Sequence, residues 1–179
     1  QRWGLPLPAQ AAARTAAAQR GLQCYRSTSG SLSLIRLIDR PVLLTLQRPG
    51  QRPGLAALVA LDGPQATLVV DGTPRRVALS ELAGAWRGEF ITFWRVPPGY
   101  AQRADDAGTL NDWLAAQLAR EPGGPASAAA PRGGAALAAQ VQAFQASQGL
   151  QPDGRAGPIT LMQINRATGV AEQRMDAAR

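Results

Sequence analysis

The feature that most constrains this 179-residue chain is a stretch near its end that reads as helix, turn, loop and helix. Apolar residues recur at helical spacing over 137–144, and Gly149 follows where a helix end favours a left-handed residue. An Asp-Gly pair at 153–154 is typical of a tight turn, and Pro158 is typical of the first position of a helix. This order predicts two short helices joined by a compact loop.

The spacing V-x-x-F-Q-x-x-x-G-L-x-x-D-G-x-x-G-x-x-T-L, from Val141 to Leu161, resembles the peptidoglycan-binding domain of many cell-wall proteins. The resemblance implies peptidoglycan as the ligand and a location outside the inner membrane. We expect the apolar residues and glycines of the motif to hold the fold. The expected ligand contacts are the polar residues Gln145, Gln148, Asp153, Arg155 and Thr160.

The remaining pattern predicts two domains. Apolar runs of strand length and the hairpin signal Asp71-Gly72 favour an α+β first domain with an antiparallel sheet. Its strands are expected at 42–46, 55–61, 66–70, 75–79 and 89–95, with helices at 8–20 and 31–38. A Pro-Pro-Gly segment then marks the boundary. We expect a first domain at 1–98, a linker at 99–103, a domain of three helices (109–120, 135–148, 158–168) at 104–170, and a tail at 171–179.

Composition limits the chemistry. The chain has no His, and all 19 of its basic residues are Arg, which excludes Ser-His and Cys-His pairs, common zinc sites, lysine Schiff bases and the P-loop lysine. We therefore expect no metal and no cofactor. The net charge of +7 lies in residues 1–100, where 12 arginines face five acids. The arginines are scattered without an aromatic ladder, so we do not expect nucleic-acid binding.

The first hundred residues, taken with the helical domain, resemble the periplasmic region of the general secretion pathway protein A family. The matching segments are Gly21–Cys24, Arg40–Leu43, Phe93–Pro98 and Gly108–Leu114. In that family the first module resembles a C39-type cysteine peptidase, a papain-like fold. Active members need a Cys at a helix start and a His opening a strand. Here Cys24 is expected near a helix start, and Leu55 stands roughly where that His would be, so the resemblance implies an inactive peptidase-like domain.

The same resemblance implies a cytoplasmic ATPase module and one inner-membrane helix upstream of these residues. It implies a periplasmic role in type II secretion, in which this protein helps its partner, the pathway's B protein, to place the outer-membrane secretin. We also expect self-association or assembly with another protein. Two alternatives stay open. One is a wall hydrolase or peptidase targeted by the second domain, and the other is a protein–protein adaptor that uses the basic first domain.

Overall fold

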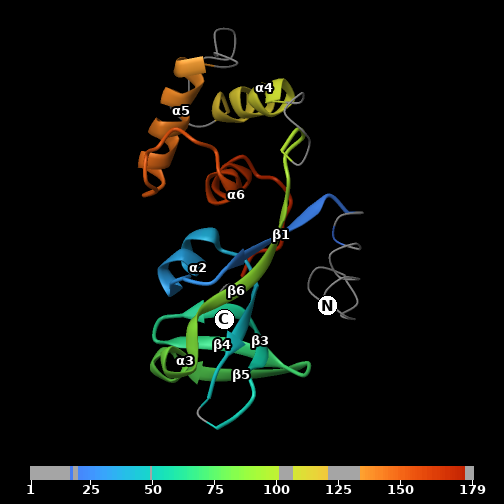
Figure 1. Cartoon of the computed structure of the whole chain (residues 1–179), viewed down its shortest axis with the longest axis vertical. Helices are drawn as coiled ribbons and strands as arrows, with labels where there is room; N and C mark the ends of the chain where they lie inside the picture. Colours follow the sequence, from blue (N-terminus) through green and yellow to red (C-terminus); the bar gives the residue numbers. More distant parts are fainter. Residues whose placement is uncertain (1–16, 18–19, 49, 101–106, 121–133, 176–179) are drawn as a thin grey trace. The chain divides into compact units, whose positions relative to one another are not determined.

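The computed structural model divides the chain into two compact units (Figure 1). The first contains Gln1–Trp94 together with Gln173–Arg179, and the second contains Arg95–Glu172. The residues that the structure describes are 17, 20–48, 50–100, 107–120 and 134–175. Most of the expected N-terminal helix and part of the expected linker lie outside these residues. In the described part, no helix is long and apolar enough to cross a membrane.

A six-stranded sheet in the order β1-β6-β2-β3-β4-β5 forms the centre of the first unit. The pairs β6-β2, β2-β3, β3-β4 and β4-β5 are antiparallel, which confirms the expected α+β class. The strands are β1 (Leu22–Ser27), β2 (Val42–Leu46), β3 (Gly54–Asp62), β4 (Gln65–Val70), β5 (Thr73–Ala78) and β6 (Trp86–Arg95). The helices are α2 (Leu32–Ile38) and α3 (Leu79–Ala85). The sequence patterns predicted all of these strands except β1.

The loop before α2 crosses β6 at a point where neither backbone has room for a side chain. The N–H of Gly30 donates to the carbonyl of Gly88 at 2.8 Å. A Cβ added at Gly30 would lie 2.4 Å from the ring of Phe90, and one added at Gly88 would lie 2.9 Å from the Gly30 carbonyl oxygen. Gly88 also has a φ of +93°, which disfavours any other residue. The two glycines therefore bring α2 down onto the buried Phe90.

The hairpin between β4 and β5 determines which backbone groups face out from the end of the sheet. Asp71 and Gly72 both have positive φ, 48° and 80°, as a two-residue type I′ turn requires. In such a hairpin the two residues that flank the turn, Val70 and Thr73, form a backbone hydrogen-bonded pair. Every second residue of β5 after Thr73 therefore points its N–H and C=O away from β4, toward the free edge of the sheet: Pro74, Arg76 and Ala78. Pro74 has no N–H, and the Ala78 N–H donates to Glu81 Oε2 at 3.3 Å. Little of this edge is left to pair with another strand.

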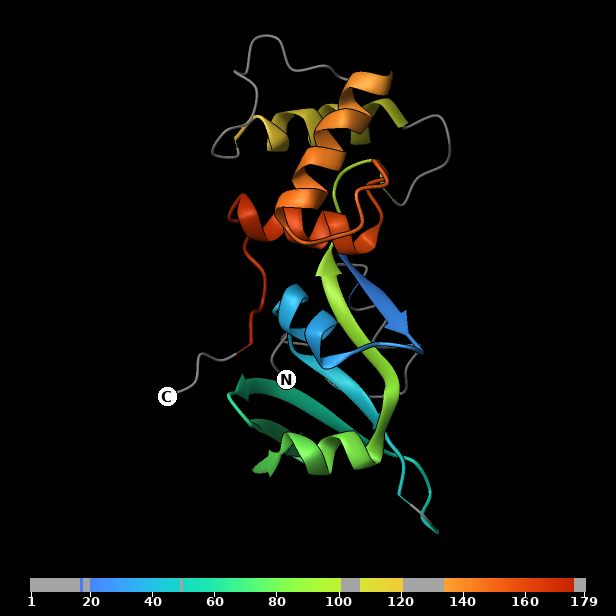
Figure 2. The ribbon, with the colours of Figure 1, turned by 90° about the vertical axis from the view of Figure 1, so that its left-hand side faces the viewer.

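Three helices make up the described part of the second unit: α4 (Ala107–Leu118), α5 (Gly134–Ser147) and α6 (Pro158–Ala167). Among the described residues, both ends of each of these helices lie within two residues of the spans expected from the apolar spacing. Figure 2 shows α5 crossing α4, with α6 near the C-terminal end of α5. Their shared core contains Leu114, Leu118, Leu137, Val141, Phe144, Leu161 and Ile164.

The chain enters and leaves the second unit at neighbouring points. The buried Asn165 donates from Nδ2 to the carbonyl of Arg95 at 2.8 Å, and Glu172 Oε1 accepts the N–H of Arg95 at 2.6 Å. After Glu172 the chain returns to the first unit. There Arg174 forms an ion pair of 3.6 Å with Asp39, and the N–H of Met175 donates to the Asp39 carbonyl.

Candidate functional site

The loop between α5 and α6 begins with the helix end that the sequence predicts. Gly149 takes a φ of +67°, and the N–H of Leu150 reaches back to the carbonyl of Gln145 at 2.8 Å. This backbone pattern is the usual glycine-dependent helix end, in which the residue after the glycine closes the last turn. It turns the chain back so that the residues after Leu150 pass beside α5.

Gln145 is the centre of this loop. Its side chain is 2% exposed, and its Nε2 lies 2.8 Å from Asp153 Oδ1, 3.0 Å from the Arg155 carbonyl and 3.1 Å from Thr160 Oγ1. Its Oε1 accepts the N–H of Gly154 at 2.9 Å. One amide thus connects α5, the loop and the first turn of α6, and both of its polar atoms are satisfied.

Gly154 allows the loop to lie directly on α5. It has a φ of +72°, and an added Cβ would be 3.1 Å from both the Ala138 carbonyl oxygen and the Cγ of Gln142. The exposed Gln142 side chain therefore lies over the loop. Gln142 is not one of the residues predicted to contact the ligand, although it lies one helical turn before Gln145.

Asp153 caps the turn with its exposed carboxylate. Its Oδ1 accepts the N–H of Arg155 at 2.9 Å in addition to the amide of Gln145. The backbone hydrogen bond from Arg155, followed by the hydrogen bond from the Gln145 side chain, lowers the pKa of the Asp153 carboxyl below its usual value. The loop is therefore built around the ionised form of this residue.

This pKa shift predicts acid sensitivity of the second unit. Because the pKa of Asp153 is lower in the folded state, its contribution is fully present above about pH 4 and is lost as the pH falls through the folded-state value. We expect Asp153→Asn to lower stability at neutral pH and to flatten its decline in acid. Urea unfolding followed by amide signals of α5 and α6 at several pH values measures this. Asp112→Asn, at an exposed position on α4, is the control and should leave the acid decline intact.

The five predicted contact residues have different environments. Gln145 and Thr160 are buried, at 2% and 5% exposure, whereas Asp153 and Arg155 are exposed on the loop. Gln145 brings these four together, and the side chain of Gln148 stays outside the network, with its Nε2 3.4 Å from Ser147 Oγ. The surface offered to a ligand therefore consists of loop residues that a buried amide positions.

The expectation that Cys24 lies near a helix start is wrong. Cys24 is a partly exposed residue inside β1, and the next helix begins only at Leu32, capped by Ser31 Oγ. Strands β6 and β2 separate β1 from β3, which carries Leu55 with a 55% exposed side chain. The thiol of Cys24 and the position of Leu55, where an active peptidase would have its His, are therefore on different parts of the sheet. Across the described ranges, no three Cys, Asp or Glu side chains are grouped as a metal site would need.

Part of the second unit resembles a known domain family. Residues 105–164, which include the loop, match the family model for a putative peptidoglycan binding domain. The chain thus combines an α+β sheet unit with a helical unit of this class. Over 169 residues, 93% of its length, it is 31% identical to general secretion pathway protein A from Aeromonas hydrophila. It spans 30% of the length of that relative.

One solved structure is similar to this chain over nearly its whole length. A periplasmic domain of the EpsAB fusion protein of the Vibrio vulnificus type II secretion system matches 95% of this chain and 74% of that chain, with a TM-score of 0.53 and 25% identity. The resemblance to general secretion pathway protein A predicted from the sequence is therefore confirmed. The peptidase domain of Streptococcus mutans ComA covers 48% of this chain and 73% of its own, with a TM-score of 0.39 and 12% identity.

Proposed function

We propose that this chain is a non-catalytic peptidoglycan-binding module of type II secretion that works in the periplasm. The observation that carries the proposal is the loop organised by Gln145, which lies within the residues that match the peptidoglycan-binding family. The similarity to a periplasmic domain of a type II secretion protein supports the location and the pathway.

In this proposal the exposed side of the loop holds the ligand. The guanidinium of Arg155 has no ion-pair or hydrogen-bond partner among the described residues, so it is available to a carboxylate of the peptidoglycan stem peptide. Asp153 interacts electrostatically with Arg155, and the Gln142 amide lies next to Gly154, so both can supply further hydrogen-bonding groups. A contact surface this small binds weakly, and several copies on one wall would supply avidity.

The finer assignments rest on the resemblance to general secretion pathway protein A. We propose that the sheet domain, at 1–98, is a papain-like domain without peptidase activity. The lack of any His in the chain and the position of Cys24 in a strand support this. We further propose that an upstream helix anchors the chain in the inner membrane. The anchored chain associates with itself or with another protein. Together with the B protein, it helps to place the secretin in the outer membrane.

Sedimentation with purified sacculi tests the binding site. We expect Arg155→Ala to lower sacculus affinity roughly tenfold, because a hydrogen-bonded charge contact contributes on that order. Arg120→Ala is the matched control, since it removes the same charge from an exposed position at the end of α4. Equal binding by both variants and the unchanged chain would contradict the assignment of the site.

Zymography on wall-impregnated gels tests the non-catalytic part separately. We expect no cleared band from the unchanged chain. Clearing that disappears in Cys24→Ala would contradict this part of the proposal and would leave the binding site of the helical unit intact.

A further inference from the structure

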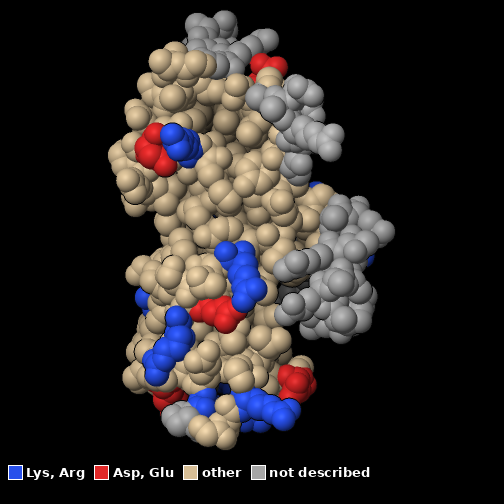
Figure 3. Space-filling view, in the orientation of Figure 1, with Lys and Arg blue, Asp and Glu red and all other residues tan. Residues whose placement is uncertain are grey.

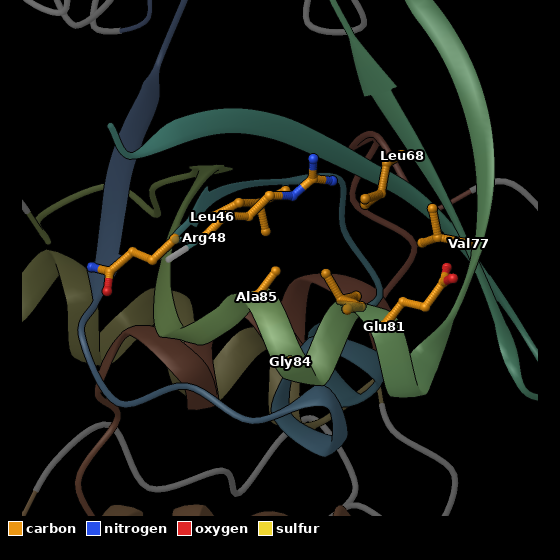
Figure 4. A pocket seen from close by; sticks show the side chains of 9 residues that line it. Leu46, Arg48, Leu68, Val77, Glu81, Gly84 and Ala85 are labelled. Carbon is orange, nitrogen blue, oxygen red and sulfur yellow. The ribbon is translucent and has the colours of Figure 1, made fainter. Parts of the chain in front are cut away.

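An open groove lies in the sheet unit between α3 and the face of the sheet, far along the chain from the loop at Gln145. It has a volume of about 370 Å³. Figure 4 shows the residues that line it: Leu46, Gln47, Arg48, Leu68, Val77, Glu81, Leu82, Gly84 and Ala85. Five of the nine are aliphatic, and Gln47, Arg48 and Glu81 add polar groups, so the groove offers both apolar and polar surface.

The groove exists because α3 presents small residues to the sheet at its C-terminal end. Leu82 is buried, but Gly84 and Ala85 follow it, and a Cβ added at Gly84 would meet nothing within 4 Å. The N–H of Gln47 donates to the carbonyl of Ala85 at 2.7 Å, which fixes the chain after β2 to this helix end. The partly exposed Leu46, beside the buried Leu68, is therefore left accessible instead of being covered by a larger helix residue.

Basic side chains without partners stand at the mouth of the groove. In Figure 4 the side chain of Arg48 reaches across toward Leu68. Arg75 is the cross-strand partner of Leu68, and paired residues share a face of the sheet, so Arg75 lies on this side too. Neither guanidinium has an ion-pair or hydrogen-bond partner among the described residues. Glu81, the one acid of the lining, already accepts the N–H of Ala78.

The described residues of the sheet unit as a whole also carry a net positive charge. Its described residues contain ten arginines against five carboxylates, and Figure 3 shows basic side chains along this part of the molecule. Such a surplus attracts acidic partners and accelerates their encounter. The nearby edge of β5 is largely blocked by Pro74 and by the Glu81 contact, so recognition here uses side chains rather than an added strand.

We propose that this groove binds an extended segment of another protein in which an aliphatic side chain stands next to a carboxylate. The aliphatic side chain enters the space over Gly84, and the carboxylate pairs with Arg48 at the mouth. This site is separate from the peptidoglycan surface, and neither depends on the other.

Amide chemical shifts of the full chain, titrated with a blocked decapeptide of alternating aspartate and leucine, test the proposal. We expect saturable shifts at Leu46, Gly84 and Ala85 at millimolar peptide, and none from a peptide of alternating aspartate and serine. Equal shifts from a lysine–leucine peptide, or no shifts with the aspartate–leucine peptide, would overturn it. So would saturation of the groove by anionic lipid vesicles in place of the peptide, or by a second copy of the chain.

Substitutions inside and outside the lining distinguish binding in the groove from attraction by the net positive charge of the unit. Gly84→Leu fills the space and also replaces a helical glycine with a better helix former, so we expect it to fold and to weaken peptide binding at least about tenfold. Arg48→Glu should weaken binding by a similar factor, whereas Arg52→Glu, the same reversal outside the lining, should have a much smaller effect. Unchanged affinity in Gly84→Leu, or equal losses in the two arginine variants, would contradict the proposal.

Discussion

Replacement of Gln145 with leucine is expected to disorder the loop at 151–157 and to abolish sacculus binding. The change leaves the Gly154 N–H without its acceptor and removes the donor that reaches Asp153, Arg155 and Thr160. Loss of a buried network of this kind costs about 3 kcal/mol of the free energy of unfolding. Hydrogen exchange at the amides of Gly154 and Arg155 measures the local effect, and urea unfolding of the second unit measures the total.

Gln148→Leu is the matched control for this prediction. Gln148 directly follows the last residue of α5 and makes one long side-chain contact, with Ser147, so we expect a change within about 0.5 kcal/mol and normal binding. If Gln145→Leu instead keeps slow exchange at Gly154 and full sacculus binding, the amide is not what positions the loop.

Replacement of Gly88 with alanine is expected to cause the largest loss of stability in the sheet unit. The new methyl group would lie 2.9 Å from the Gly30 carbonyl oxygen, a backbone atom that cannot move without displacing α2. The φ of +93° adds the cost of a left-handed conformation in a residue with a Cβ. Together we expect about 3 kcal/mol or more, seen as a lower urea midpoint and as changed shifts around Phe90.

Gly72→Ala separates the cost of the positive φ from the cost of the steric clash. Gly72 has a similar φ of +80°, but an added Cβ there meets nothing within 4 Å. We expect this variant to lose only the conformational part, about 1 kcal/mol. Equal losses in Gly72→Ala and Gly88→Ala would mean that the close crossing of the two backbones contributes nothing.

Local signals predicted most of the fold. Asp71-Gly72 marked the β4–β5 turn because both positions need positive φ, and apolar spacing marked α4, α5 and α6. The sequence did not reveal β1, because Leu22–Ser27 alternates poorly in polarity and its pairing partner β6 lies more than 60 residues away. The error at Cys24 has the same origin, since the strand assignment depends on that distant pairing.

The sequence predicted which residues form the candidate site, but it did not predict that Gln145 is buried. A glutamine is ordinarily exposed, so Gln145 reads as a contact residue in isolation. Its position relative to Val141, four residues earlier on the same helix face, was the available signal that it points inward. What spacing could not give is the set of inward-facing loop acceptors, at Asp153 and Arg155, that makes burial of this amide favourable.

The largely blocked outer edge of β5 has a consequence for the proposed weak binding by many copies on one wall. Crowded sheet proteins are prone to cross-β aggregation wherever one free strand can template another. With Pro74 lacking its donor and Ala78 already engaged by Glu81, the N–H of Arg76 is the one outward donor of β5 that remains for a neighbouring strand. High local density on a surface can then raise avidity without seeding insoluble fibrils from this side of the sheet.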